Sequence, residues 1–304
     1  MIGTLLARSL TLLAISAAAL TSCHRESDEN LGLGERSIYK VRAVAINSLD
    51  KPSELLHALS LPGSERDRYL GAHKVEAKST LRMSMAGSAS KEALDETYAF
   101  STDGRGNFAL VHDNDHGYGT EARLKDGELF VRPRYGKFIR RRPEAEEPET
   151  LRAGVERVAA DYVDLLQSGL AIDVAGKGDW QGHPVIALKF SRASKPSRPE
   201  VQREIERKWR DSVVVDRIDG AATLDAATGA PLAFKIDAAY HFDREGKQID
   251  VALSYQEKVS PTMEPISVPV DVVESPRRPR PMLDRQQLLE GLAERPASQG
   301  ADTH

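Results

Sequence analysis

Apolar and polar residues alternate with a period of two along several stretches of the chain, which is the pattern of β-strands with one buried face. The alternation is most regular over 234–242 and 249–255, two stretches separated by the turn residues Arg244-Glu245-Gly246. The same pattern runs over 75–85, where the residues on one side are Val75, Ala77, Ser79, Leu81, Met83 and Met85. Strands of this kind form antiparallel sheets with one polar face, so the sequence predicts such a sheet.

Turn residues between shorter alternating stretches predict further hairpins. Asp126-Gly127 separates 121–125 from 128–132, and this dipeptide favours a two-residue hairpin turn. Asp103-Gly104-Arg105-Gly106 lies between the strand that contains Tyr98 and Phe100 and the strand Phe108–Val111. The predicted sheet is therefore a meander of hairpins.

Helical spacing of apolar residues is found mainly in one segment. Over 149–168 they recur every three or four positions, and Gly169 is placed to end a single long helix. This helix can cover the apolar face of the sheet. Lys51–Leu59 is a shorter helix candidate, and Arg198–Arg210 has the pattern of an exposed amphipathic helix inserted between strands.

The first 22 residues have the features of a signal peptide. Arg8 precedes an apolar run over 10–20, which is shorter than the roughly 20 residues needed to span a bilayer. The sequence Leu20-Thr21-Ser22-Cys23 resembles a bacterial lipobox, and Cys23 is the only cysteine of the chain. The resemblance implies cleavage before Cys23 and acylation of its thiol. The alternative is an ordinary signal peptide, or an uncleaved anchor, with an incidental cysteine.

Acylation at Cys23 would attach the protein to a membrane, since several acyl chains together anchor stably. In lipoproteins of Gram-negative bacteria an aspartate after the cysteine favours retention in the inner membrane. His24 stands at that position, so the resemblance implies the outer membrane. The polar stretch 23–36 is predicted to be a flexible tether between the lipid and the folded body.

Charge and cysteine content exclude several other classes of protein. The 304 residues include 42 Lys and Arg against 46 Asp and Glu, and the resulting net charge of −4 argues against a nucleic-acid partner. A single cysteine excludes an internal disulfide framework and a cysteine-based zinc site.

Two local motifs and the order of the elements resemble lipoproteins of the LolA/LolB/LppX type. The motifs are Asp179–Pro184, which leads into the alternating strand Val185–Phe190, and Thr223–Leu232. In the second motif Asp225 can cap the turn, Gly229 takes a positive φ and Pro231 begins the next strand.

The resemblance covers residues 37–260 and implies an α+β fold: a curved, unclosed antiparallel sheet, or half-barrel, covered by one long helix and shorter helices. The charged insert at 192–211 and the C-terminal part, 261–304, depart from the family. The latter is predicted to be a Pro/Arg-rich linker, a short helix over 283–292 and a frayed tail.

The family binds hydrophobic ligands inside the half-barrel. In this chain the candidate ligand-binding residues are Met83, Met85, Val131, Tyr162, Tyr240 and Leu253. The same lining would include Val75, Leu81, Leu129, Ile236 and Val251. The alternative is that these side chains simply form the core. Met83 and Met85 are the better candidates because flexible thioethers suit adaptable apolar pockets.

The residues that could carry other chemistry are few. His112-Asp113-Asn114-Asp115-His116 could ligate a divalent metal, but Asp and Asn in a turn bond their own backbone, and an exposed turn is the preferred interpretation. His183 and His241 are interpreted as solvated. No nucleophile-elbow, zincin, P-loop or dinucleotide motif is present in the sequence, so we expect a protein without catalytic activity, metal or cofactor.

Two basic clusters bear on possible partners. The first cluster comprises Arg132, Arg134, Lys137, Arg140, Arg141 and Arg142. It could contact anionic lipid or peptidoglycan. The preferred interpretation is that these residues pair with acidic neighbours in the sequence. The second, Arg277, Arg278 and Arg280, could dock on an envelope protein. Two functions follow: a lipid-anchored module that binds a hydrophobic ligand, or an envelope interaction or sensor protein whose sheet presents a surface to a partner.

Overall fold

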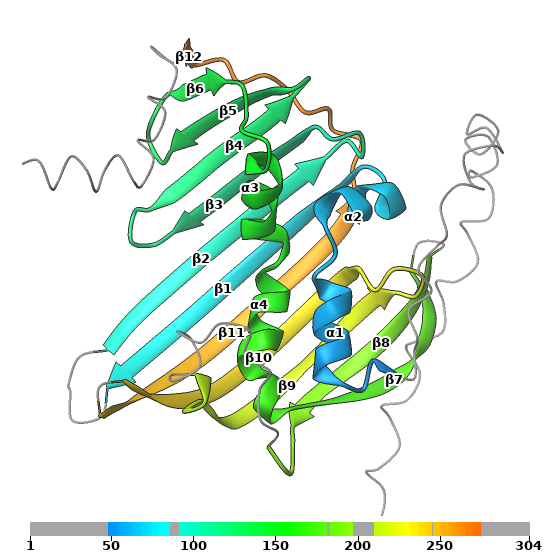
Figure 1. The fold of residues 1–304 in the computed structure, drawn as a ribbon, viewed down its shortest axis with the longest axis vertical. Coiled ribbons are helices and arrows are strands. Elements are labelled where there is room, and N and C mark those ends of the chain that lie inside the picture. Colours follow the sequence, from blue (N-terminus) through cyan, green and yellow to red (C-terminus); the bar gives the residue numbers. More distant parts are fainter. Residues whose placement is uncertain (1–47, 86–90, 181–182, 197–209, 245, 275–304) are drawn as a thin grey trace, which may run out of the picture. The chain divides into compact units, whose positions relative to one another are not determined.

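A single open sheet of 12 strands dominates the computed structural model, which describes residues 48–85, 91–180, 183–196, 210–244 and 246–274 (Figure 1). The strand order is β12-β6-β5-β4-β3-β2-β1-β11-β10-β9-β8-β7. All neighbouring strands are antiparallel except β12 and β6. The two end strands, β12 and β7, are not paired with each other, so the sheet is unclosed, as the family resemblance implied.

The strands follow the hairpin order expected from the sequence. Their bounds are β1 His73–Met85, β2 Lys91–Thr102, β3 Phe108–Asn114, β4 Gly119–Lys125, β5 Glu128–Pro133, β6 Phe138–Arg141, β7 Leu170–Trp180, β8 His183–Arg192, β9 Val214–Asp225, β10 Pro231–Arg244, β11 Lys247–Pro261 and β12 Val272–Glu274.

The period-two pattern corresponds to the buried and exposed faces of the strands. In β11 the odd-numbered residues from Val251 to Val259 are buried, while the even-numbered residues between them are exposed. In β1, Val75, Ala77 and Ser79 are buried on the same face. These three side chains lie opposite the buried residues Val259, Glu257 and Tyr255 of β11, which stabilises the register.

The predicted turns are also present. Asp126 and Gly127 both have positive φ, 51° and 80°, as a two-residue hairpin turn requires. In the β9–β10 turn the Asp225 carboxylate accepts hydrogen bonds from the backbone N–H groups of Ala227 and Thr228 and from the Thr228 hydroxyl. Gly229 has φ 76° and β10 begins at Pro231, as predicted.

The helices lie on one face of the sheet, called here the inner face (Figure 1). Two of them, α1 Pro52–Leu59 and α2 Gly63–Leu70, precede the sheet in sequence, and the first was predicted. Two more, α3 Glu147–Glu156 and α4 Val158–Leu166, are followed by a 3₁₀ turn over Gln167–Gly169. Within the described residues, none of the helices has the length and apolar character needed to cross a bilayer.

The prediction of one long helix over 149–168 is wrong, because the segment consists of two helices with a break at Arg157. This residue has φ −105° and ψ 2°, so it ends α3 and caps α4. Gly154 lowers the helix propensity of the turn before the break. The break changes which side chains are buried: α3 buries Arg152 and Glu156 beside Val155, whereas α4 buries only apolar residues.

Several predicted segments lie outside the described residues. These are the signal peptide, Cys23, the tether, the insert helix apart from Arg210, and the C-terminal linker with its helix. The segment after β11 was assigned to the C-terminal part, but residues 272–274 form β12 and extend the sheet beside β6. A strand of three residues gives too little periodicity to be found from sequence.

A buried ion pair connects the helices α2 and α3, and a second one lies within α3. The Arg152 guanidinium, with a side chain only 5% exposed, donates two hydrogen bonds to the Asp67 carboxylate of α2 at 2.8 and 2.9 Å. It donates two more to Glu156 at 2.9 and 3.2 Å. Gly63 makes room for this group, since a Cβ there would lie 2.4 Å from Arg152 Nε.

The same guanidinium also contacts aromatic rings of the sheet. Its carbon lies 4.9 Å from the ring centre of Phe100 on β2 and 5.8 Å from that of Phe108 on β3. Asp67 in turn accepts a hydrogen bond from the Thr102 hydroxyl at the end of β2. Arg152 therefore holds α2, α3 and the two strands at one point.

We predict that Arg152→Met destabilises the protein by about 3–5 kcal/mol, because Asp67 and Glu156 would remain buried without a cation. Chemical denaturation of the variant and the parent gives this difference. Arg142→Met is the matched control, because Arg142 is exposed, and it should change stability by less than about 0.5 kcal/mol. A loss for Arg152→Met as small as that of the control would contradict the role assigned to the ion pairs.

A second buried carboxyl group lies on β11. Glu257 accepts a hydrogen bond of 2.6 Å from the Tyr255 hydroxyl, and the residue is 4% exposed. Burial raises the pKa of Glu257 above its ordinary value, although the nearby Arg66 and the hydrogen bond from Tyr255 partly oppose the shift. The native protein therefore holds this proton to a higher pH than the unfolded chain does.

This raised pKa predicts a pH-dependent effect of Glu257→Gln. As the pH rises above about 4.5, the unfolded chain loses the Glu257 proton while the native chain retains it, so the parent loses stability. Glutamine has no such proton, and the stability of the variant relative to the parent should increase from pH 4 to pH 7. Urea denaturation across this range measures it, with exposed Glu144→Gln as the control. A difference that is constant with pH would contradict the prediction.

Candidate functional site

The candidate site is the part of the inner face formed by the ends of β1, β2, β10 and β11. Among the described elements, the helices cross the middle of the sheet and leave these strand ends uncovered (Figure 1). The register places Met83 between Val251 of β11 and Glu92 of β2, and it places Met85 opposite Ile249. Strand β10 continues these rows with Tyr240 and Phe242.

Six apolar side chains in these rows are only partly covered. Met85 is 37% exposed and the others are half-buried, and four of them, Leu81, Met83, Phe242 and Ile249, pack against the buried core. We call this set the apolar floor: Leu81, Met83, Met85, Leu94, Phe242 and Ile249. It has the composition of a surface that accommodates an apolar chain, because aromatic, aliphatic and thioether groups adapt to one another.

Tyrosine hydroxyls lie beside the apolar floor. Tyr162 of α4 shares a hydrogen bond of 2.6 Å with the Ser79 hydroxyl of β1, and its ring centre is 5.1 Å from that of Tyr255. Burial raises the pKa of Tyr240 to about 12. For Tyr98, burial and the Glu96 carboxylate raise the pKa well above the ordinary range. These phenols stay protonated at neutral pH and act only as hydrogen-bonding groups.

The structure brings together five of the six candidate ligand-binding residues. Met83, Met85, Tyr240 and Leu253 lie on neighbouring strands, and Tyr162 approaches them from α4. Tyr240 and Leu253 are buried at 6% and 3% exposure and belong to the core, whereas the two methionines are at the open end. Val131 lies apart from this group on β5, which β2, β3 and β4 separate from β1.

The wider predicted lining is mostly core. Val75, Leu129, Ile236 and Val251 are each at most 4% exposed and belong to the main apolar cluster, while Leu81 is half-buried. For these four side chains the structure supports the alternative interpretation, in which they fill the protein interior.

Sequence reasoning missed several residues of the site. Phe242 and Ile249 were recognised as strand residues but not as candidates for ligand binding. Glu92, Leu94 and Glu96 of β2 were not selected because the start of this strand is mostly polar, with Leu94 as its one large apolar residue. Extending the alternation back from Tyr98 by steps of two would have found all three.

The histidine-rich segment is the end of a strand followed by a turn: 112–114 are half-buried in β3, and Asp115 and His116 lie in the exposed turn that was the preferred interpretation. β3 ends at Asn114, whose side-chain oxygen accepts hydrogen bonds from the backbone N–H groups of His116 and Tyr118. His112 Nε2 lies 3.0 Å from a Glu96 oxygen, and His116 Nε2 lies 2.8 Å from the Ala93 carbonyl. In the part of the chain that the structure describes, no three metal-binding side chains are gathered at one place.

The other two histidines that the sequence analysis considered, His183 and His241, lie elsewhere. His241 is on the outer face of β10, where its Nδ1 lies 3.0 Å from an Asp216 oxygen, a partner that the sequence did not indicate. His183 begins β8.

Four arginines of the first basic cluster are paired with carboxylates, in agreement with the preferred interpretation. Arg132 pairs with Glu121, Arg134 with Asp113, Arg140 with Glu128 and Glu274, and Arg141 with Glu147. Arg132 also lies 4.3 Å from the ring centre of Phe138, which is buried on the outer face of the sheet. Lys137 and Arg142 are exposed.

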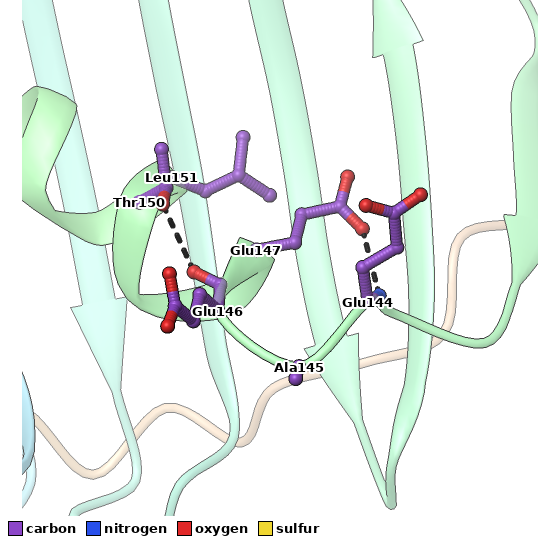
Figure 2. A pocket seen from close by; sticks show the side chains of 6 residues that line it. All are labelled: Glu144, Ala145, Glu146, Glu147, Thr150 and Leu151. Carbon is purple, nitrogen blue, oxygen red and sulfur yellow. Dashed lines mark hydrogen bonds between the residues drawn. The ribbon is translucent and has the colours of Figure 1, made fainter. Parts of the chain in front are cut away.

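A surface hollow of about 570 Å³ lies at the start of α3 (Figure 2). Its lining residues are Glu144, Ala145, Glu146, Glu147, Thr150 and Leu151. The Glu147 carboxylate accepts a hydrogen bond from the backbone N–H of Glu144, and the Thr150 hydroxyl donates a hydrogen bond to the Glu146 carbonyl (Figure 2). Three carboxylates make this hollow unsuitable for an acyl chain, so it is separate from the candidate site.

No protein-family model matches the sequence, and neither does any curated protein. Among solved structures, the chain is similar to a LolA superfamily protein from Nitrosomonas europaea, with 10% identity, coverage of 71% of this chain and 95% of that one, and a TM-score of 0.22. It is similar to LprF from Mycobacterium bovis, with 13% identity, coverage of 66% and 92%, and a TM-score of 0.22.

A third similar structure is a DUF1329 family protein from Desulfovibrio piger, with 9% identity, coverage of 69% and 92%, and a TM-score of 0.20. The LolA superfamily protein belongs to the group that the sequence resembles. At these identities and TM-scores nothing about ligands or partners is transferred to this chain, and the fold rests on the strand register described above.

Proposed function

We propose that this protein is a non-catalytic lipoprotein of the cell envelope, anchored to the outer membrane by acyl chains on Cys23, and that it binds an acyl chain or another hydrophobic ligand. The observation that carries the proposal is the apolar floor, an apolar surface continuous with the core but left partly open at the ends of four strands. A hydrophobic ligand would complete the cover that α4 provides over the middle of the sheet.

The free energy of ligand binding would come from the apolar area that the ligand covers. Covering apolar surface yields roughly 25 cal/mol per Å², so a chain that lies over several half-exposed side chains gains several kcal/mol before the cost of ordering it. The ends of β1 and β11 are antiparallel neighbours with a regular register, which gives the floor a fixed shape. The site therefore requires no catalytic group, only adaptable apolar contacts.

A second candidate function is supported by exposed aromatic residues at the same end of the sheet. Tyr118, in the β3–β4 turn, is 75% exposed, and Tyr135, in the β5–β6 turn, is 86% exposed. Tyr135 also has φ 65°, a conformation that is unfavourable for a bulky residue. Exposed tyrosines are typical anchors of protein interfaces, so these two would carry an interaction or sensor function.

The anchor is tested by metabolic labelling with an acyl probe in the bacterial host. We expect the full-length chain to incorporate the label and to fractionate with membranes, because the Cys23 thiol is the only possible thiol acceptor. Cys23→Ser should abolish both. Label that persists in the variant would refute acylation at this position.

The ligand is tested by native mass spectrometry of the chain from residue 24 onward, purified from cells and then extracted with organic solvent. We expect a bound acyl species in the parent. Met83→Glu should remove it, since the substitution places a charge in the apolar floor.

The matched control is Ser84→Glu, at the adjacent position of β1 on the opposite face. It should retain the ligand. An apo mass for the parent, with no uptake of a fluorescent acyl probe, would reject the ligand-binding function and direct attention to Tyr118 and Tyr135.

A further inference from the structure

The apolar inner face continues toward the β12 edge of the sheet, away from the apolar floor. The register of β4, β5, β6 and β12 aligns four apolar residues in one row on this face: Ala122, Val131, Ile139 and Val273. We call this row the edge row. Exposure rises along it from Ala122, which is completely buried, to Ile139 and Val273, which are each 39% exposed.

The described helices lie mainly over other strands. Helix α3 is the nearest, and its Arg152 contacts the rings of Phe100 and Phe108, so it packs over β2 and β3 (Figure 1). The start of α3 touches β6 at the next row, where Glu147 pairs with Arg141. The outer end of the edge row therefore keeps apolar surface exposed on the face that helices cover elsewhere.

The chain leaves β12 beside this surface. Val273 is the last residue but one of β12, and the segment 275–304 lies outside the described residues. Its first part, the predicted Pro/Arg-rich linker over 275–281, has seven residues, which reach about 22 Å in polyproline II geometry. The three strand spacings from β12 to β4 measure only roughly 14 Å. The residues after the linker can therefore reach every position of the edge row.

The next part of the segment has the pattern of a covering helix. Over 283–292 the sequence predicts a short helix, in which residues three and four positions apart lie on one side. The residues with this spacing are Leu288, Leu289 and Leu292. Arg285 lies on the same side, one turn nearer to the linker. The segment thus offers an apolar helix face with a cation at its beginning.

Charge favours a path of the linker along the start of α3. Strand β12 is parallel to β6, so the linker leaves β12 in the direction in which β6 continues to α3. The exposed charges there are mostly acidic: Glu144, Glu146, Glu149 and, as a cation, Arg142. The linker carries three arginines, Arg277, Arg278 and Arg280. These opposite charges attract one another, and salt weakens the attraction.

We propose that the segment 275–304 docks on its own sheet, with the linker beside the start of α3 and the helix 283–292 over the edge row. The three leucines then cover Ile139 and Val273, as α4 covers the middle of the sheet. The protein itself closes this end of the inner face and leaves the apolar floor for a ligand. The proposal is independent of the ligand-binding function, because the occupant is part of the chain.

Disulfide trapping in the chain from residue 24 onward tests the docking, because that chain contains no cysteine. One variant combines Ile139→Cys with Leu289→Cys, and the control combines Val111→Cys with Leu289→Cys. Val111 is 40% exposed on the outer face of β3. This strand is four spacings, roughly 19 Å, from β12, which is also within reach of the linker. A segment that does not dock would therefore form both disulfides.

We expect the Ile139 pair to form an intramolecular disulfide about tenfold faster than the Val111 pair in a glutathione redox buffer, because docking raises the effective concentration of the two thiols. Peptide mass spectrometry identifies the bond. Equal rates for the two pairs would overturn docking on the inner face. Disulfides that join two molecules would also overturn it and would indicate a second copy as the occupant.

Hydrogen exchange provides a readout without cysteines. Backbone amides over 283–292 should exchange slowly in the parent and about tenfold faster in Ile139→Asp, which places a charge under the helix. Val111→Asp is the control of matched exposure and should leave this exchange unchanged. Fast exchange in the parent, or protection that Ile139→Asp does not alter, would contradict the proposal.

Discussion

The arrangement of helices over the sheet depends on one buried cation. Arg152 reaches two carboxylates and two aromatic rings at once, so α2, α3 and the strands β2 and β3 are fixed relative to one another. Removing such a group from water is costly unless every hydrogen bond is supplied, which leaves little freedom in how α3 docks. The chain then breaks at Arg157, and α4 continues over apolar core residues only. Helix α4 leaves the apolar floor uncovered, and the functional proposals rest on this surface.

Much of the fold could be predicted because its determinants are local. The side-chain alternation of β1, β10 and β11 follows from burial of one face, and it is visible in the sequence without knowledge of any partner strand. The turns at Asp126-Gly127 and Asp225–Pro231 follow from backbone conformations and hydrogen bonds within a few residues. Met83, Met85 and Tyr240 of the candidate site were found by the same alternation, and Tyr162 by the helical spacing of apolar residues over 149–168.

The parts that could not be predicted depend on contacts distant in sequence. Arg152 and Glu156 have the composition of a solvated helix face, and only Asp67, 85 residues before Arg152, makes their burial possible. Strand β1 pairs with β11 across more than 150 residues, so the rows that join Met83 to Val251 cannot be read from either strand alone. For the same reason Val131 was grouped with residues that lie on strands far from β5.

The two edges of the open sheet are protected from pairing with other molecules in different ways. An edge strand exposes unpaired backbone groups, which invite a strand from another molecule. On one side the described part of β12 has three residues. On the other side β7 is 11 residues long, but an irregularity between Val174 and Gly176 interrupts its ladder, and Asp173 and Lys177 are exposed along it. Among the described residues neither edge is a long, flat template, which disfavours the joining of neighbouring copies edge to edge into fibres.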